Sequence, residues 1–177
     1  MMAYRPVVLY LVALAIVTSI VALASPAAAA DPVELRIEVY GFAGFHVLTN
    51  RTRVSASGDQ YSIATDLDTR GLASVFVDLT SHSEVRGRLT QDAVRPDAYH
   101  GEVRRNGSDS RYRIDYRGDG TLASDQMPPS PALRSAAAAD QMRGTVDQLT
   151  VFFIIERQLA QRGSCGMVVP VFDGLSR

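Results

Sequence analysis

Several stretches of this chain alternate apolar or small residues with charged residues, and this pattern constrains the fold more than any other feature. The clearest stretches are 34–39, 84–89 and 111–117. Because successive side chains of a β-strand point to opposite faces, each stretch predicts a strand with one apolar face and one charged face. The pattern is typical of an antiparallel sheet with water on one face, and not of a parallel sheet covered on both faces.

Glycine-containing turns separate the predicted strands. Residues 57–59 (Ser-Gly-Asp) and 106–108 (Asn-Gly-Ser) each lie between two alternating stretches and are typical of hairpin connections. Residues 118–120 (Gly-Asp-Gly) predict a further turn. Gly41 and Gly44 predict that the first strand bends or ends there, since glycine inside a strand often marks a bend.

Two segments have the period of a helix. Apolar residues three and four positions apart predict a short amphipathic helix at 71–79. A longer helix is predicted at 145–162, where Thr145 and Gln148 form a capping box and Gly163 is a typical stop. Its apolar residues occupy most sides: Leu149, Val151, Phe152, Phe153, Ile154 and Ile155. We therefore expect this helix to form the centre of the core.

Together these elements predict a mainly β (α+β) fold. A curved antiparallel sheet, in the form of an open half-barrel, would wrap around the apolar C-terminal helix. Residues 31–177 are enough for a single domain with its own core. Residues 124–143 contain three prolines and an alanine-rich stretch, and they predict a flexible loop between sheet and helix.

The first thirty residues have the layout of a secretory signal peptide. Arg5 precedes an apolar run over 7–24, and Pro26 precedes four alanines. This order predicts cleavage after Ala30 and a periplasmic or secreted product. The alternative is an uncleaved anchor, because about 18 apolar residues are the lower limit for crossing a bilayer. After cleavage we expect no stable transmembrane segment.

Charge and cysteine content narrow the function. The chain has 18 basic and 19 acidic residues, which argues against a nucleic-acid partner because such a partner requires a clustered basic face. Cys165 is the single cysteine. In an exported protein an odd cysteine is either a spare thiol or half of a missing pair.

Several motifs together resemble the bacterial domain-of-unknown-function family 3108, over most of residues 33–176. The motifs lie at 35–44, 61–63, 69–72, 96–99, 147–149 and 170–174. The resemblance implies an exported envelope protein without assigned activity. Its implied shape is similar to lipoprotein-carrier proteins, in which helices plug an open β half-barrel around an apolar hollow. Members of the family continue with further strands and a second cysteine. The resemblance therefore implies either an apparent truncation at the C-terminus or a shortened variant, with Cys165 unpaired and a sheet edge open.

Residues with catalytic or ligand chemistry form no recognisable motif. His46, His82 and His100 lack the spacing of helical metal ligands. Asp66 and Asp68 share a predicted strand face, which is typical of a solvated surface. Asp78 and His82 would form a surface pair if the short helix extended. We assign no catalytic, cofactor-binding or metal-ligating residue and expect no cofactor.

Arginines recur along the predicted strands, with acidic residues between them. They are Arg86, Arg88, Arg104, Arg105, Arg111, Arg113 and Arg117. We interpret them as cross-strand ion pairs, the alternative being a basic stripe that binds an anionic headgroup or polysaccharide.

Three functional hypotheses follow. In the first, a non-enzymatic protein binds a hydrophobic or lipid-like ligand between sheet and helix, although the same residues would also fit a solid core. The expected lining is Phe42, Phe45, Phe76, Phe152, Phe153 and Ile155. In the second, a structural or scaffolding protein pairs with a partner chain through an open sheet edge after Phe172. The third is a hydrolase-type enzyme that uses Asp66 and Asp68 with His82 or His100.

Overall fold

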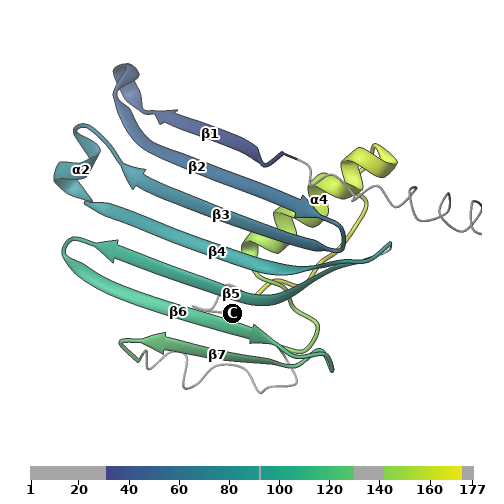
Figure 1. Cartoon of the computed structure of the whole chain (residues 1–177). Coiled ribbons are helices and arrows are strands. Elements are labelled where there is room, and N and C mark those ends of the chain that lie inside the picture. Colours follow the sequence, from purple (N-terminus) through teal and green to yellow (C-terminus); the bar gives the residue numbers. More distant parts are fainter. Residues whose placement is uncertain (1–30, 92, 130–141, 173–177) are drawn as a thin grey trace, which may run out of the picture.

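A computed structural model describes residues 31–91, 93–129 and 142–172. This part of the chain is mainly β. Its seven-stranded sheet is antiparallel throughout, and the strands follow one another in chain order (Figure 1). The strands are β1 (Val33–Tyr40), β2 (His46–Ser57), β3 (Gln60–Thr69), β4 (Leu79–Leu89), β5 (Val94–Arg105), β6 (Ser108–Tyr116) and β7 (Leu122–Met127). The predicted antiparallel sheet is confirmed.

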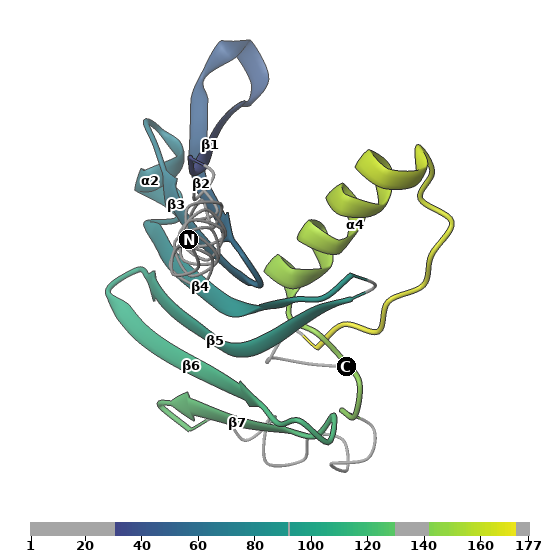
Figure 2. The same ribbon diagram turned by 45° about the vertical axis from the view of Figure 1, so that its right-hand side comes forward.

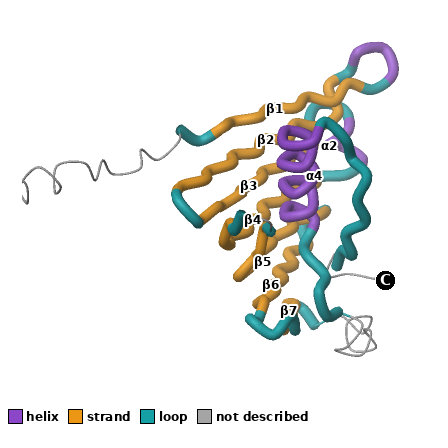
Figure 3. Tube along the Cα trace, turned by 90° about the vertical axis from the view of Figure 1, so that its right-hand side faces the viewer, coloured by secondary structure: helices purple, strands orange, loops and turns teal. Residues whose placement is uncertain are grey.

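Three helical elements accompany the sheet within the described residues. A 3-10 turn, η1 (Phe42–Gly44), connects β1 to β2, and α2 (Ala73–Phe76) connects β3 to β4. The long helix is α4 (Gln148–Arg162). It lies on one face of the sheet (Figures 2 and 3) and packs mainly against β4 and β5. Within the described ranges, no helix combines the length and apolar character needed to span a bilayer.

The core lies on the face of the sheet that α4 covers. Its buried residues are Tyr61, Ile63, Val85, Tyr99, Ile114, Leu122 and Phe153. Two glycines make room for tyrosine rings on this face. A Cβ at Gly87 would lie 2.6 Å from the ring of Tyr61, and one at Gly101 would lie 2.2 Å from the ring of Tyr112. The missing side chains thus allow two large aromatic residues to lie flat on the sheet.

The N-cap of α4 lies two residues after the predicted one. Asp147 is the N-cap, and its side chain accepts a hydrogen bond from the backbone N–H of Thr150. The predicted capping box of Thr145 and Gln148 is wrong, because the Thr145 hydroxyl donates to the carbonyl of Met142 instead. The predicted stop is confirmed: Gly163 has a left-handed φ of 65° and closes the helix.

The expectation that α4 would be covered on most sides is not met. Only Thr150 and Phe153 of this helix are buried. Phe153 stacks on Tyr61 with ring centroids 5.1 Å apart, whereas Phe152, the next residue round the helix, is 60% exposed. The helix therefore packs through one side, and the centre of the core is the sheet face itself.

Two other predicted segments need correction. The helix predicted at 71–79 is limited to the four residues of α2, and Leu79 already belongs to β4. The predicted loop at 124–143 begins within β7, which pairs with β6 although its sequence has little apolar alternation. Residues 130–141 and the predicted leader, 1–30, lie outside the described residues.

Candidate functional site

A buried polar cluster fixes the start of α4 against the sheet. The carboxylate of Asp147 accepts hydrogen bonds from the Thr150 backbone N–H (2.8 Å), the Thr150 hydroxyl (2.7 Å) and the Tyr116 hydroxyl (3.1 Å). The hydroxyl oxygens of Tyr61 and Thr150 lie 3.0 Å apart and share a hydrogen bond. Asp147 and Thr150 are fully buried. Because every oxygen already has a partner, this cluster is an anchor for the helix and not a reactive site.

Burial also changes the acidity of the tyrosines around this anchor. Removal from water raises the pKa of Tyr61 and of Tyr116 well above the ordinary value, and the nearby Asp147 carboxylate raises both further. Burial likewise raises the pKa of Tyr99, whose hydroxyl lies 3.1 Å from that of Tyr112. All three phenols therefore stay protonated to a higher pH than an exposed tyrosine would.

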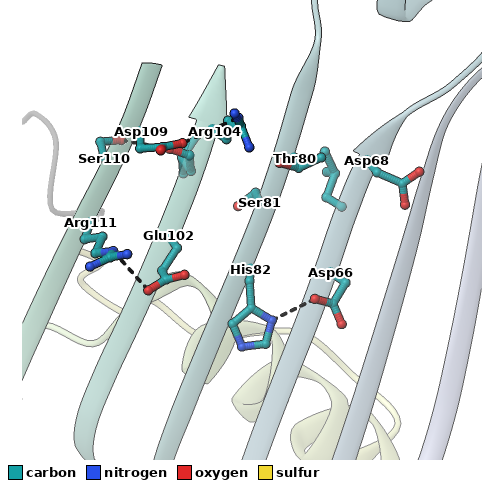
Figure 4. A pocket seen from close by; sticks show the side chains of 12 residues that line it. Asp66, Asp68, Thr80, Ser81, His82, Glu102, Arg104, Asp109, Ser110 and Arg111 are labelled. Atoms are coloured by element: carbon teal, nitrogen blue, oxygen red, sulfur yellow. Dashed lines mark hydrogen bonds and ion pairs between the residues drawn. The ribbon is translucent and has the colours of Figure 1, made fainter. Parts of the chain in front are cut away.

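The sheet face opposite α4 carries a polar hollow of about 440 Å³ (Figure 4). Nδ1 of His82 lies 2.7 Å from a carboxylate oxygen of Asp66, and Arg111 contacts Glu102 at 3.2 Å. The strand register explains the grouping, because Asp66, His82 and Glu102 lie directly opposite one another on β3, β4 and β5.

The structure brings some of the residues of the enzyme hypothesis together. Asp66, Asp68 and His82 all line this hollow. His100 lines a neighbouring hollow together with Glu84. Its Nε2 lies 3.5 Å from a carboxylate oxygen of Glu102. The predicted pair of Asp78 and His82 does not form, because His82 lies within strand β4 and bonds across to β3.

Ion pairs satisfy most charges of this polar face. Asp68 contacts both Arg51 and Arg70. Five of the arginines singled out in the sequence have an acidic partner: Arg86 with Glu84, Arg88 with Asp97, Arg104 with Asp109, Arg111 with Glu102, and Arg113 with Asp115. Among the described residues, no three His, Cys, Asp or Glu side chains have an arrangement that could hold a metal ion. The face is a network of solvated ion pairs.

An apolar row remains uncovered on the other face, at the edge of the sheet. It consists of Val33, Leu35, Ile37 and Val39 on β1, which we call the β1 row. These side chains are between 41% and 64% exposed. Val33 lies opposite Val54 of β2, and Val54 packs against the core. The β1 row therefore lies on the same face as α4, beyond the part that the helix covers, with Leu35 and Ile37 opposite the polar Thr52 and Asn50.

The six residues expected to line a hollow do not come together. Phe153 is buried and Ile155 half-buried on α4, whereas Phe152 points into solvent. Phe42, Phe45 and Phe76 lie on the connections at one end of the sheet and are exposed. A third hollow, of about 410 Å³, is at the opposite end and is lined mostly by polar residues and turn backbone.

The segment after α4 returns to the start of that helix. Val171 forms a parallel bridge with Val146, through hydrogen bonds of 3.0 Å from the Val146 N–H and 2.9 Å from the Phe172 N–H. Cys165 lies on this returning segment, exposed and free. The edge predicted after Phe172 falls outside the described residues. The sheet edges within the described part are β1 and β7.

Comparison with known proteins adds no relative: no family model, no curated protein and no solved structure matches this chain.

Proposed function

We propose that this chain is an exported, non-catalytic protein that binds a hydrophobic or lipid-like ligand on the sheet face beside α4. The observation that carries the proposal is the β1 row, four neighbouring aliphatic side chains that remain largely in water. Single exposed apolar residues are normal on a soluble protein, whereas a contiguous apolar row marks a surface used for binding.

The size of the row suits a long acyl chain. From Val33 to Val39 there are six residue steps of about 3.3 Å, which gives a row roughly 20 Å long. Each side chain is about half exposed, so covering it would contribute roughly 1 kcal/mol, and the whole row roughly 4 kcal/mol. The ion-paired opposite face gives no comparable apolar surface.

In this proposal the sheet acts as an open half-barrel that wraps around the ligand and α4. The resemblance to family 3108 supports this arrangement, because it implies a shape similar to lipoprotein carriers. The predicted signal peptide supports an envelope location, with cleavage after Ala30 and a periplasmic or secreted product. Cys165 has no assigned part in binding.

Uptake of a fluorescent fatty acid tests this proposal. The double variant Leu35→Gln/Ile37→Gln removes half of the β1 row, and we expect binding about 30-fold weaker, equivalent to about 2 kcal/mol. The matched control is Arg36→Gln/Glu38→Gln, which changes the same edge strand on its other face and should bind like the parent chain.

Three results would count against lipid binding. They are absence of probe uptake by the parent chain, absence of lipid in an organic extract of the protein purified from cells, or equal loss in both double variants. Circular dichroism of each variant separates loss of binding from loss of the fold, since all four positions are exposed or half-exposed.

A scaffolding role is the second candidate, and the free edge of β1 favours it. This strand has eight residues and, among the strands that the structure describes, pairs only with β2, so its outer side offers backbone groups to a strand of another chain. Sedimentation equilibrium over a wide concentration range tests the idea with a second copy as partner. A chain that stays monomeric and whose β1 amides are protected from exchange would contradict it.

A further inference from the structure

Two segments at one end of the sheet are apolar and uncharged, and the exposed Arg70 and Asp78 flank the second of them. They are residues 41–45 (Gly-Phe-Ala-Gly-Phe), around η1, and 71–77 (Gly-Leu-Ala-Ser-Val-Phe-Val), around α2. We call these two segments the apolar end. Phe42 is 97% exposed and Phe76 82% exposed, and Phe45, Leu72 and Val75 are also exposed.

The two segments of the apolar end lie beside each other. The backbone N–H of Arg70 donates to the carbonyl of Val47 at 2.8 Å, and a Cβ on Gly71 would lie 3.0 Å from the carbonyl of His46. Figure 1 shows both connections at the same end of β1–β4. The exposed side chains therefore project from one end of the molecule.

The opposite end of the sheet has a different composition. Its turns include residues 57–60 (Ser-Gly-Asp-Gln), which connect β2 to β3, and 117–121 (Arg-Gly-Asp-Gly-Thr), which connect β6 to β7. Their charged residues, Asp59, Arg117 and Asp119, are exposed. Exposed apolar side chains are thus a feature of these two segments and not of the connections in general, since the turn between β5 and β6 at the apolar end is the polar pair Asn106 and Gly107, which bonds to Asp78.

Several backbone N–H groups of the apolar end are bonded within their own segments. The Gly41 N–H donates to the carbonyl of Phe45 and the Gly44 N–H to that of Gly41. In α2, the Ser74 N–H donates to the carbonyl of Gly71, and the hydroxyl of Ser74 does the same. Because an unsatisfied polar group costs several kcal/mol in hydrocarbon, such internal bonding suits segments that leave water for an apolar medium.

From these observations we propose that the apolar end inserts into the surface of a lipid bilayer. Side chains that protrude from two separate turns fit a fluid medium, which closes around them without a preformed pocket. Tyr40, Arg70 and Arg105 lie just behind the two segments, where an aromatic hydroxyl and guanidinium groups would meet headgroups. This inference goes beyond the proposed function, because docking to a bilayer does not require a ligand on the β1 row.

Single tryptophan reporters test the insertion locally, because the chain contains no tryptophan. The full chain carrying Phe42→Trp or Phe76→Trp is mixed with vesicles of phosphatidylethanolamine and phosphatidylglycerol. We expect a blue shift of the emission and quenching by brominated acyl chains. The matched control is Phe152→Trp, an exposed aromatic on α4, which should show neither change. Any binding through residues 1–30 would be common to all three proteins.

Removal of one of the two aromatic rings gives the second measurement. In vesicle flotation of Phe42→Trp, adding Phe76→Ser should weaken binding about 10- to 100-fold. Binding of the parent should survive about 0.5 M salt, because apolar insertion is not screened. The Leu35→Gln/Ile37→Gln variant should bind vesicles normally, which separates this inference from the proposed function. Equal spectral shifts at all three reporter positions, or none at positions 42 and 76, would overturn the inference.

Discussion

Substitution of Asp147 by alanine should weaken the fold more than any other single change at the start of α4. The side chain is fully buried and accepts three hydrogen bonds, two from Thr150 and one from Tyr116. Thr150 would keep its hydroxyl contact with Tyr61. The Tyr116 hydroxyl would lose its acceptor in the buried cluster.

The expected size follows from these contacts. Loss of a helix cap costs about 1 kcal/mol, and each of the two hydroxyl bonds to a charged acceptor contributes about 1.5 kcal/mol or more. Removing a buried charge offsets part of this loss of stability, because the desolvation penalty of the charge disappears. We expect Asp147→Ala to lower the free energy of unfolding by about 3 kcal/mol. That corresponds to a melting temperature roughly 6–12 °C lower for a chain of this size.

Urea denaturation followed by circular dichroism measures this loss directly. Asp119→Ala is the matched control: Asp119 accepts two bonds, both from Thr121, but it is exposed, so its loss should cost clearly less than the loss of Asp147. Asp147→Asn retains an acceptor for the cap and should fall between the two. If Asp147→Ala costs no more than Asp119→Ala, the buried cluster does not anchor the helix.

Three further predictions concern the core. Phe153→Ala should cost about 3–5 kcal/mol and Phe152→Ala less than about 1, and similar urea midpoints for the two would refute the one-sided packing of α4. Gly101→Ala should cost about 1–3 kcal/mol of unfolding free energy, because the new methyl group clashes with Tyr112. Most of that loss should vanish in a Tyr112→Ser background, and additive effects of the two substitutions would refute the clash. Above pH about 10 the unfolded state loses phenolic protons that the folded state keeps. The free energy of unfolding should therefore be constant below that pH and fall by roughly 4 kcal/mol per pH unit above it, which urea titrations at several pH values would record. The three tyrosines responsible are Tyr61, Tyr99 and Tyr116.

The sheet was predictable where side-chain alternation is strong. Residues 34–39 and 111–117 indicated β1 and β6 because one face of each is apolar or aromatic and the other charged. β7 was missed because its six residues include little apolar alternation, and its pairing with β6 comes from tertiary context. Its position next to the proline-rich stretch also favoured a loop.

The surroundings of apolar residues were harder to predict than the elements themselves. Phe42 and Phe76 were expected to line a hollow because apolar residues are usually covered, but both lie on short connections with no element above them. Apolar residues occur on most sides of α4, so their distribution in the sequence did not indicate that only one side of the helix would pack against the sheet. The cap of α4 had a visible signal, since aspartate is among the favoured N-cap residues and Asp147 precedes Thr150 by three positions.

The polar hollow illustrates a further limit of the sequence. Asp66 and Asp68 were recognisable as neighbours on one strand face, but their meeting with His82 depends on the register between β3 and β4. Sixteen residues separate Asp66 from His82 in the chain. Periodicity within each strand cannot determine which residues lie opposite each other when the connection is as long as 70–78.

The most direct test of the central claim is a methyl NMR titration of the chain with palmitate. We predict that the methyl signals of the β1 row shift with saturation, whereas those of the buried Val85 and Ile114 remain unchanged. Unshifted signals from the β1 row at saturating palmitate, or shifts spread equally over the buried methyl groups, would contradict the claim that this uncovered row binds an apolar ligand.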